Sequence, residues 1–213
     1  MRGVLITLEG GEGSGKSTLI EGLVAALTAR GVDTVATREP GGSPLAEAVR
    51  SLVLTPPGGH RWTPMAEALL MNAARADHIA QRISPALADG QVVLSDRYAD
   101  STRVYQSIGS GVPMSQLVAM EAIVTASAKP DLTLILDAAP EDLLERRACR
   151  DGGVAGDGDV FEGRDLDFHR AVRQGFLDIA AEESIRCVVL NALAEPQRLL
   201  ERALGAIDQR LKI

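Results

Sequence analysis

The chain has 213 residues, of which 46% are hydrophobic, and this length and composition predict one domain, residues 1–213, with one core. A net charge of −7 disfavours polymeric nucleic acid as a partner, because coating a polyanion requires a basic surface. The sequence has no signal-peptide pattern and no apolar stretch of about 18 residues, so we expect no membrane contact. Cys149 and Cys187 lack metal-binding spacing and indicate a reducing, cytoplasmic setting.

Short apolar runs alternate with helical patterns along the chain. The predicted strands are 4–9, 34–37, 92–96, 132–137 and 187–190. The predicted helices are 16–30, 44–54, 64–88, 115–127, 140–150, 164–183 and 195–211. Ser43, Thr63 and Ser115 are expected as N-caps, and Gly31 and Gly90 as the residues that end helices. This alternation predicts an α/β fold, a parallel sheet covered by helices on both faces.

The first strand leads into residues 10–18, which read GGEGSGKST. The pattern G-x-x-x-x-G-K-[ST] between a strand and a helix is typical of a phosphate-binding loop. Glycines let backbone N–H groups turn toward phosphate oxygens, and the helix that follows directs its positive end at them. We expect Lys16 to reach the β- and γ-phosphates of a nucleotide and Ser17 to be a ligand of Mg²⁺.

Ligands of such sheets bind at the carboxyl ends of the strands, where Glu9, Arg38, Asp96 and Asp137 fall. Asp96 precedes Arg97, which permits two interpretations. The carboxylate can orient Mg²⁺ while the arginine holds a second phosphate, or the two groups form an ordinary ion pair at the strand end.

Two further groups of residues have side chains suited to binding a small molecule. Met71 and Arg75 lie one helical turn apart, although Met71 alone is equally suited to core packing. Ser101, Thr102, Tyr105 and Gln106 supply hydroxyl and amide groups of the kind that bind a base and a sugar; they are named here as one set.

The segment 151–159 is rich in glycine and aspartate and follows several arginines. It is either a flexible surface connection or part of a mobile lid, about residues 146–164, that closes arginines over a phosphate.

From the phosphate loop to about residue 183 the chain resembles bacterial thymidylate kinases. The resemblance rests on the loop from Glu9 to Ser17, TREPGG at 37–42, Ala-Ala-Arg at 73–75, Asp96-Arg97-Tyr98, residues 101–106 and the strand 132–137. It implies a P-loop kinase fold, a three-layer α/β/α sandwich with a five-stranded parallel sheet and a lid. It also implies transfer of the γ-phosphoryl group of ATP to dTMP, with Mg²⁺, and a cytoplasmic homodimer.

The same resemblance implies a role for individual residues. ATP would bind at Gly10, Gly11, Glu12, Gly13, Ser14, Gly15, Lys16, Ser17 and Thr18, with Mg²⁺ at Ser17 and Asp96. The acceptor dTMP would bind at Glu39, Pro40, Arg50, Met71, Arg75, Arg97, Thr102, Tyr105 and Gln106. Catalysis would depend on Lys16, Arg97, Glu12 and the lid arginine Arg150.

The chain departs from the family pattern at two positions. Met71 stands where a phenylalanine usually stacks on thymine, and Val160 stands where the lid usually carries an arginine. Arg147 and Arg164 are alternatives for the missing cation.

The sequence also leaves three other functions open. They are a kinase for a purine monophosphate or a nucleoside, a GTPase, and a protein that binds nucleotides without turnover. An N-K-x-D guanine motif is absent from the sequence, which argues against the GTPase.

Overall fold

The computed structural model describes residues 2–109, 111–150, 165–211 and 213. Its sheet has five parallel strands in the order β2-β3-β1-β4-β5. The strands are β1 (Val4–Gly10), β2 (Thr34–Arg38), β3 (Val92–Asp96), β4 (Leu132–Asp137) and β5 (Cys187–Asn191). Each predicted strand is confirmed to within one residue at either end.

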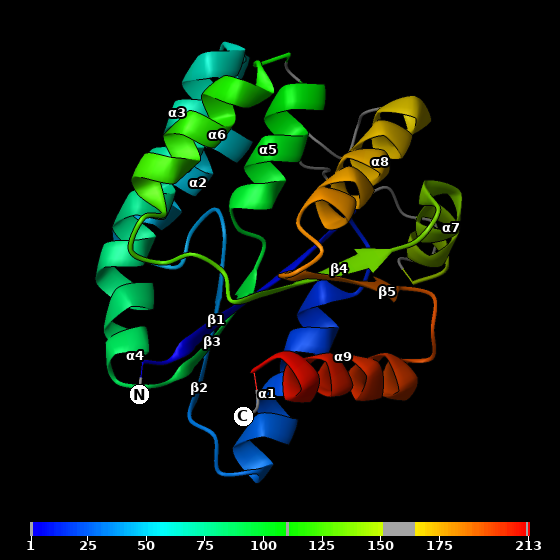
Figure 1. Ribbon diagram of the computed structural model, residues 1–213. Helices are drawn as coiled ribbons and strands as arrows, with labels where there is room; N and C mark the ends of the chain where they lie inside the picture. The colour runs from blue at the N-terminus through cyan, green and yellow to red at the C-terminus, as the bar shows by residue number, and fades with distance from the viewer. Residues whose placement is uncertain (1, 110, 151–164, 212) are drawn as a thin grey trace.

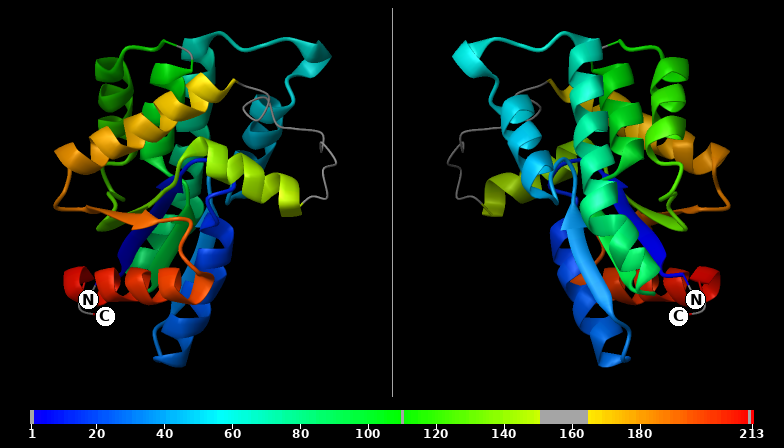
Figure 2. Two further views of the ribbon diagram at one scale, coloured as in Figure 1. Left: turned by 90° about the vertical axis from the view of Figure 1, so that its right-hand side faces the viewer. Right: turned by 90° about the vertical axis from the view of Figure 1, so that its left-hand side faces the viewer.

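Helices cover both faces of the sheet, as Figures 1 and 2 show. Helices α1 and α9 pack on one face, and α4, α5 and α8 pack on the other, with α3 and α6 outside them. The helices are α1 (Lys16–Ala29), α2 (Pro44–Leu54), α3 (Pro64–His78), α4 (Ser84–Ala88), α5 (Ala99–Ile108), α6 (Met114–Val124), α7 (Pro140–Arg150), α8 (Leu166–Glu182) and α9 (Pro196–Leu211). The predicted α/β/α sandwich is therefore confirmed.

The alternation of side chains along each strand divides the core between the two faces. Ile6 and Leu8 of β1 are buried against α1 and α9, together with Leu94 of β3. Leu5 and Val93 point to the other face and pack near α4. Both faces are apolar because both are covered, so the strands read as continuous apolar runs.

Three expectations about helices need correction. Helix α5 is absent from the predicted helices, although it carries all four residues of the set Ser101, Thr102, Tyr105 and Gln106. The predicted helix 64–88 is not uniform: Ile79–Ile83 is π-helical between α3 and α4, next to Pro85, which has no N–H to donate. Ser115 lies inside α6, whose N-cap is Pro113, so it is not a cap.

The other helix signals agree with the structure. Ser43 caps α2 by accepting a hydrogen bond from the N–H of Ala46 at 3.4 Å. Thr63 is the N-cap residue of α3, although its side chain makes no capping hydrogen bond. Gly31 and Gly90 have positive φ angles just after helices end.

Candidate active site

The site lies at the carboxyl edge of the sheet, where β1 has β3 on one side and β4 on the other. The strand order reverses at β1, and in open α/β sheets a crevice forms beyond such a strand. β1 ends at Gly10 with a φ of +134°, and a Cβ atom there would lie 2.4 Å from the carbonyl oxygen of Leu136. Only glycine fits at this point, so the sharp departure of the loop from the sheet depends on it.

The loop between β1 and α1 has the form of an anion-binding nest. Ser14 Oγ donates to the carbonyl of Gly11 at 2.8 Å, and Gly15, with a φ of +92°, leads into α1. The ammonium group of Lys16 donates to the carbonyls of Gly10 (3.2 Å) and Gly11 (2.8 Å) and to Ser14 Oγ (3.3 Å). The loop therefore has its cation in place for a phosphate.

The environment of Lys16 disfavours its charge. Its side chain is buried, and burial, together with the nearby charge of Arg97, lowers the pKa of Lys16 to about 7. An anionic phosphate in the loop would reverse that shift, because an opposite charge stabilises the ammonium form. Phosphate binding would therefore change the protonation state of Lys16.

Two oxygen-bearing side chains lie together beside the loop. The hydroxyl of Ser17 donates to Oδ2 of Asp96 at 2.9 Å, which joins α1 to the end of β3. A hydroxyl and a carboxylate are hard oxygen ligands of the kind that Mg²⁺ accepts, with water and phosphate oxygens completing its shell. By contrast, Asp137 at the end of β4 is paired with Arg173, its two oxygens at 2.7 and 2.9 Å from Nε and Nη2.

Arg97 lies between the loop and a neighbouring cavity. It has a φ of +67°, a left-handed conformation unusual for a residue with a side chain. Its Nη1 donates to the carbonyl of Gly10 and to Ser101 Oγ, both at 3.1 Å, and its guanidinium lies 5.1 Å from the centre of the Tyr105 ring. One cation thus borders both parts of the site.

The neighbouring cavity has a volume of about 100 Å³. Every residue predicted to bind the acceptor lines it, and so does Glu12 of the loop. Leu54 and Tyr98 also line the cavity and were not expected there, although Tyr98 stands in the Asp96-Arg97-Tyr98 motif; Ser101 was expected only as one of the hydroxyl groups suited to a base and a sugar. The complete lining is Glu12, Glu39, Pro40, Arg50, Leu54, Met71, Arg75, Arg97, Tyr98, Ser101, Thr102, Tyr105 and Gln106.

The floor of this cavity is a buried cation with fixed orientation. Arg75 Nε donates to Oε2 of Glu39 at 2.7 Å, and its Nη2 donates to the carbonyl of Tyr98 and to Thr102 Oγ1, both at 3.0 Å. The other oxygen of Glu39 lies 3.0 Å from Nδ1 of His78. Since both oxygens of Glu39 are engaged, this carboxylate acts on the cavity through Arg75.

Gln106 presents a buried acceptor whose partner is not found among the described residues. Its Nε2 donates to Glu67 at 2.8 Å, whereas its buried Oε1 has no hydrogen bond among the described residues. A buried amide oxygen without a donor costs free energy unless a ligand supplies one. The cavity is therefore suited to a ligand with an N–H or O–H group at this position.

At the mouth of the cavity, Arg50 Nη1 donates to the carbonyl of Pro40 at 2.8 Å. Met71 contacts the cluster formed by Val104, Tyr105 and Phe176. Met71 therefore lines the cavity and packs against the core at once.

A second cavity, of about 180 Å³, lies on the other side of the loop. It is lined by loop and α1 residues, by Arg146 of α7, and by the start of α9. Arg146 Nη1 donates to the carbonyl of Ala192 at 3.0 Å, which fixes one wall. This cavity was not expected from the sequence, because the segment after β5 carries no motif, and Arg146 falls at the start of the predicted lid, 146–164.

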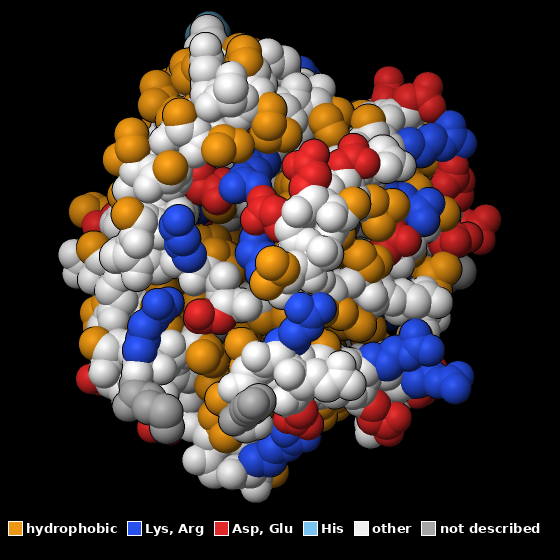
Figure 3. All heavy atoms as spheres, in the orientation of Figure 1, with side chains coloured by type: hydrophobic (Ala, Val, Ile, Leu, Met, Phe, Trp, Pro, Cys, Tyr) orange, Lys and Arg blue, Asp and Glu red, His pale blue; other side chains and the backbone are white. Residues whose placement is uncertain are grey.

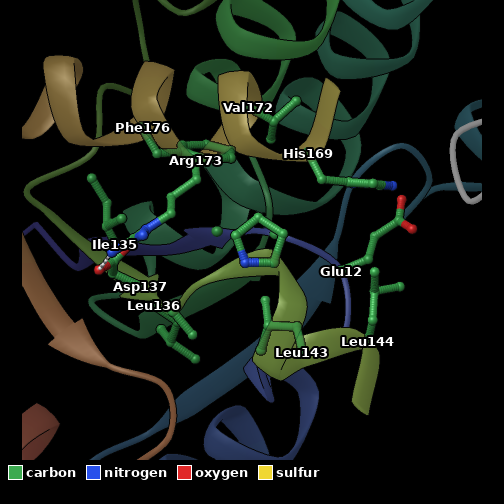
Figure 4. A pocket seen from close by; sticks show the side chains of 14 residues that line it. Glu12, Ile135, Leu136, Asp137, Leu143, Leu144, His169, Val172, Arg173 and Phe176 are labelled. Carbon is green, nitrogen blue, oxygen red and sulfur yellow. Dashed lines mark hydrogen bonds and ion pairs between the residues drawn. The ribbon is translucent and has the colours of Figure 1, made fainter. Parts of the chain in front are cut away.

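A third cavity, of about 50 Å³, lies between α7, α8 and the edge of the sheet. Figure 4 shows the ring of His169 and the carboxylate of Glu12 turned toward each other at one end, and Arg173 with Asp137 at the other.

The predicted lid lies mostly outside the described residues. Helix α7 ends at Arg150, and the structure does not describe the side chains of 147–150. It also does not describe 151–164, the range that contains Val160 and Arg164.

These features define a P-loop kinase fold with a phosphate loop and an adjoining basic cavity. Comparison with known proteins agrees. A family model described as thymidylate kinase matches residues 8–202. Thymidylate kinase from Caulobacter vibrioides is 47% identical over 210 residues, covering 99% of this chain and 98% of the relative. Thymidylate kinase from Rhodopseudomonas palustris is also 47% identical, with coverage of 99% and 91%.

A solved structure gives the same result. The crystal structure of thymidylate kinase from Ehrlichia chaffeensis is 30% identical, with a TM-score of 0.78 and coverage of 97% of this chain and 100% of that chain. The chain belongs to the thymidylate kinase family, and it is an enzyme of the P-loop nucleoside monophosphate kinases.

Proposed function

We propose that the protein transfers the γ-phosphoryl group of ATP to dTMP and releases dTDP and ADP. Family membership supports phosphorylation of dTMP. The observation that carries the proposal is the position of Arg97, which borders the acceptor cavity and bonds to Gly10 of the phosphate loop. A phosphate held there from the acceptor side would face a nucleotide held by the loop.

ATP would bind with its phosphates on the loop from Gly10 to Thr18 and its adenine in the cavity beside Arg146. Lys16 already lies within the loop, and the cavity of about 180 Å³ continues from Gly15 along α1. Ser17 and Asp96 would hold Mg²⁺. When bound, the ion would offset the negative charge of the phosphates.

The acceptor phosphate would bind to Arg97 and Arg50, and the base would lie between Met71 and Arg75. The free Oε1 of Gln106 would accept from the N3–H group of thymine, and Arg75 would donate to a base carbonyl. Thr102, Glu39 and Pro40 support this wall of the cavity. Tyr105 would lie against the deoxyribose and exclude a 2′-hydroxyl.

Catalysis would depend on position and charge rather than on a general base, since a phosphate acceptor is ionised at neutral pH. Lys16 and Arg97 would neutralise the charge that develops on the transferred group. Arg150 would add a cation from the lid, and the family resemblance assigns Glu12 of the loop to catalysis as well. Closure of the lid would exclude the water that otherwise hydrolyses ATP.

We also propose a homodimer in the cytoplasm. No helix among the described residues combines the length and the apolar character needed to cross a bilayer. Figure 3 shows hydrophobic side chains gathered over α3 and α6, where Met65, Leu69, Met114 and Val118 are exposed. An exposed apolar face of this kind fits a second copy of the chain. Analytical ultracentrifugation would show whether the protein has the mass of a dimer in solution.

The test is ADP formation with a panel of acceptors on one preparation. We expect kcat/KM to be highest for dTMP, then dUMP, with dCMP, UMP and the purine monophosphates far behind. Cytosine carries an amino group where thymine carries O4, so a buried donor would stay unpaired at a cost of about 1–3 kcal/mol. The thymine methyl group contributes only about 0.8 kcal/mol.

A panel in which dCMP or a purine monophosphate ranks first would contradict the assignment to dTMP. A nucleoside that outperforms every monophosphate would contradict the role of Arg97 and Arg50 as phosphate ligands. Nucleotide binding without any turnover would contradict the kinase activity and would indicate a protein that only binds nucleotides.

A further inference from the structure

Helix α5 begins in an unusual way. Its N-cap residue is Tyr98, whose side chain makes no capping hydrogen bond, because the hydroxyl lies far away and donates to the carbonyl of Ala128 at 2.8 Å. The first backbone N–H groups of a helix have no partner within the helix and need an acceptor from elsewhere. At α5 the N–H of Tyr98 is buried, so water does not replace its acceptor.

The acceptor is Glu9, the residue of β1 that precedes the phosphate loop. Its Oε1 accepts from the N–H of Tyr98 at 2.8 Å and from the N–H of Ser101 at 3.2 Å. In a capping box, two side chains of the same helix end bind these two groups. Here one fully buried carboxylate from a different strand does both.

The same carboxylate orients Arg97. Oε2 of Glu9 accepts from Ser101 Oγ at 2.6 Å, and that hydroxyl oxygen accepts in turn from Arg97 Nη1 at 3.1 Å. The backbone of Arg97 is held on both sides as well: its N–H donates to the carbonyl of Leu8 and its carbonyl accepts from Ser95 Oγ. A left-handed residue with a side chain persists only when its surroundings determine it in this way.

We propose that Glu9 is a positioning residue of the acceptor site, which caps α5 from β1 and holds Arg97 against the phosphate loop. The proposal rests on the proposed role of Arg97 as a ligand of the acceptor phosphate. Glu9 does not line the acceptor cavity, so it acts through Ser101 and Arg97. Because it adjoins Gly10 in the chain, it ties the position of Arg97 to the phosphate loop.

The test compares Glu9→Ala, Glu9→Gln and Ser101→Ala with the unaltered protein. The measurements are kcat and KM for dTMP, and the dissociation constant of ATP from calorimetry. We expect Glu9→Ala to lower kcat/KM for dTMP by on the order of 100-fold, as displacement of a positioned group does. We expect the affinity for ATP to change by less than about threefold, because the loop keeps its own contacts.

Glu9→Gln should have a smaller effect, since the amide oxygen can still accept from both N–H groups. Its NH₂ group would donate to Ser101 Oγ, where the carboxylate of Glu9 accepts from that hydroxyl. If Glu9 acts through the Ser101 hydroxyl, the variant with both Glu9→Gln and Ser101→Ala should lose little more than the worse single variant. Full additivity of the two losses would contradict the relay. These two conservative variants also decide the question if Glu9→Ala does not fold.

Asp131→Ala is the matched control. Asp131 also accepts a backbone N–H bond on β1, from Leu5 at 2.8 Å, but at the end of the strand remote from the site. It should lower the midpoint of thermal unfolding and leave kcat/KM unchanged. The proposal fails if Asp131→Ala and Glu9→Ala lose activity equally, or if Glu9→Ala loses ATP affinity as much as it loses dTMP turnover.

The two proposals can fail separately. An unaltered protein that does not phosphorylate dTMP would contradict the proposed function. Normal turnover of dTMP by both the unaltered protein and Glu9→Ala would contradict only the role of Glu9.

Discussion

The ion pair between Arg75 and Glu39 offers a sharp test of how burial determines the value of a charge pair. Arg75 Nε and Glu39 Oε2 are 2.7 Å apart, and the two side chains are 3% and 4% exposed. Arg30 Nη1 and Asp208 Oδ1 are also 2.7 Å apart, but their side chains are 40% and 47% exposed. The two pairs share chemistry and distance and differ in solvent contact.

Removal of Glu39 leaves a buried guanidinium without its counter-charge, and removal of Asp208 leaves a hydrated one. We therefore expect Glu39→Ala to reduce the free energy of unfolding by about 3–5 kcal/mol. Asp208→Ala should reduce it by less than about 1 kcal/mol. In a chain of this size each kcal/mol lowers the thermal midpoint by roughly 2–4 °C, so the midpoints should fall by about 6–20 °C and by less than about 4 °C.

Urea unfolding followed by far-ultraviolet circular dichroism measures both changes. Glu39→Gln is the informative third variant, because its amide oxygen can still accept from Arg75 and keep the guanidinium in place. It should recover part of the stability that Glu39→Ala loses. Equal losses in Glu39→Ala and Asp208→Ala would refute the reasoning, since burial would then have no effect on the cost of the lost partner.

Three predictions concern the cations that we propose as phosphate ligands. Lys16→Ala should abolish turnover and leave the circular dichroism spectrum unchanged; unaltered activity would remove the phosphate loop from the mechanism. Because the pKa of Lys16 is lowered to about 7, Lys16 should take up roughly 0.9 proton when ATP binds at pH 8. This uptake should vanish below about pH 6, where Lys16 is already charged. Calorimetry in buffers of different ionisation enthalpy measures the number of protons, and Lys16→Ala is the control. Arg150→Ala should lower kcat by on the order of 10³-fold with little change in KM; a loss below about tenfold would direct attention to Arg147 and Arg164.

The fold and the phosphate loop could be predicted because their signals are local. Glycines 10, 13 and 15 with Lys16 stand within one short segment, and apolar runs mark each strand. The partners of Arg75 could not be predicted in the same way. Glu39 lies on the loop after β2 and Tyr98 at the start of α5, and only the order β2-β3-β1 brings these segments together.

Helix α5 shows why a functional segment can hide its structure. Its sequence from Ala99 to Ile108 is rich in polar residues, because one face forms the acceptor cavity and another contacts Glu121 and Glu183 through Arg103. A helix that buries polar groups against a ligand site has a weak apolar pattern. Its start depends on Glu9, a residue of another strand, so the capping signal is absent from the helix sequence.

The carbonyl oxygen of Gly10 explains how the two halves of the site are joined. It accepts from Lys16 Nζ at 3.2 Å and from Arg97 Nη1 at 3.1 Å, so two cations converge on one backbone dipole. Their repulsion contributes to the lowered pKa of Lys16, which means that the site holds positive charge at a cost while no anion is present. An anionic phosphate on the loop would offset the positive charge that Arg97 places beside Lys16, and the pKa of Lys16 would then rise. The proton taken up by Lys16 when ATP binds is therefore the measure of how strongly the two cations act on each other while no phosphate is bound.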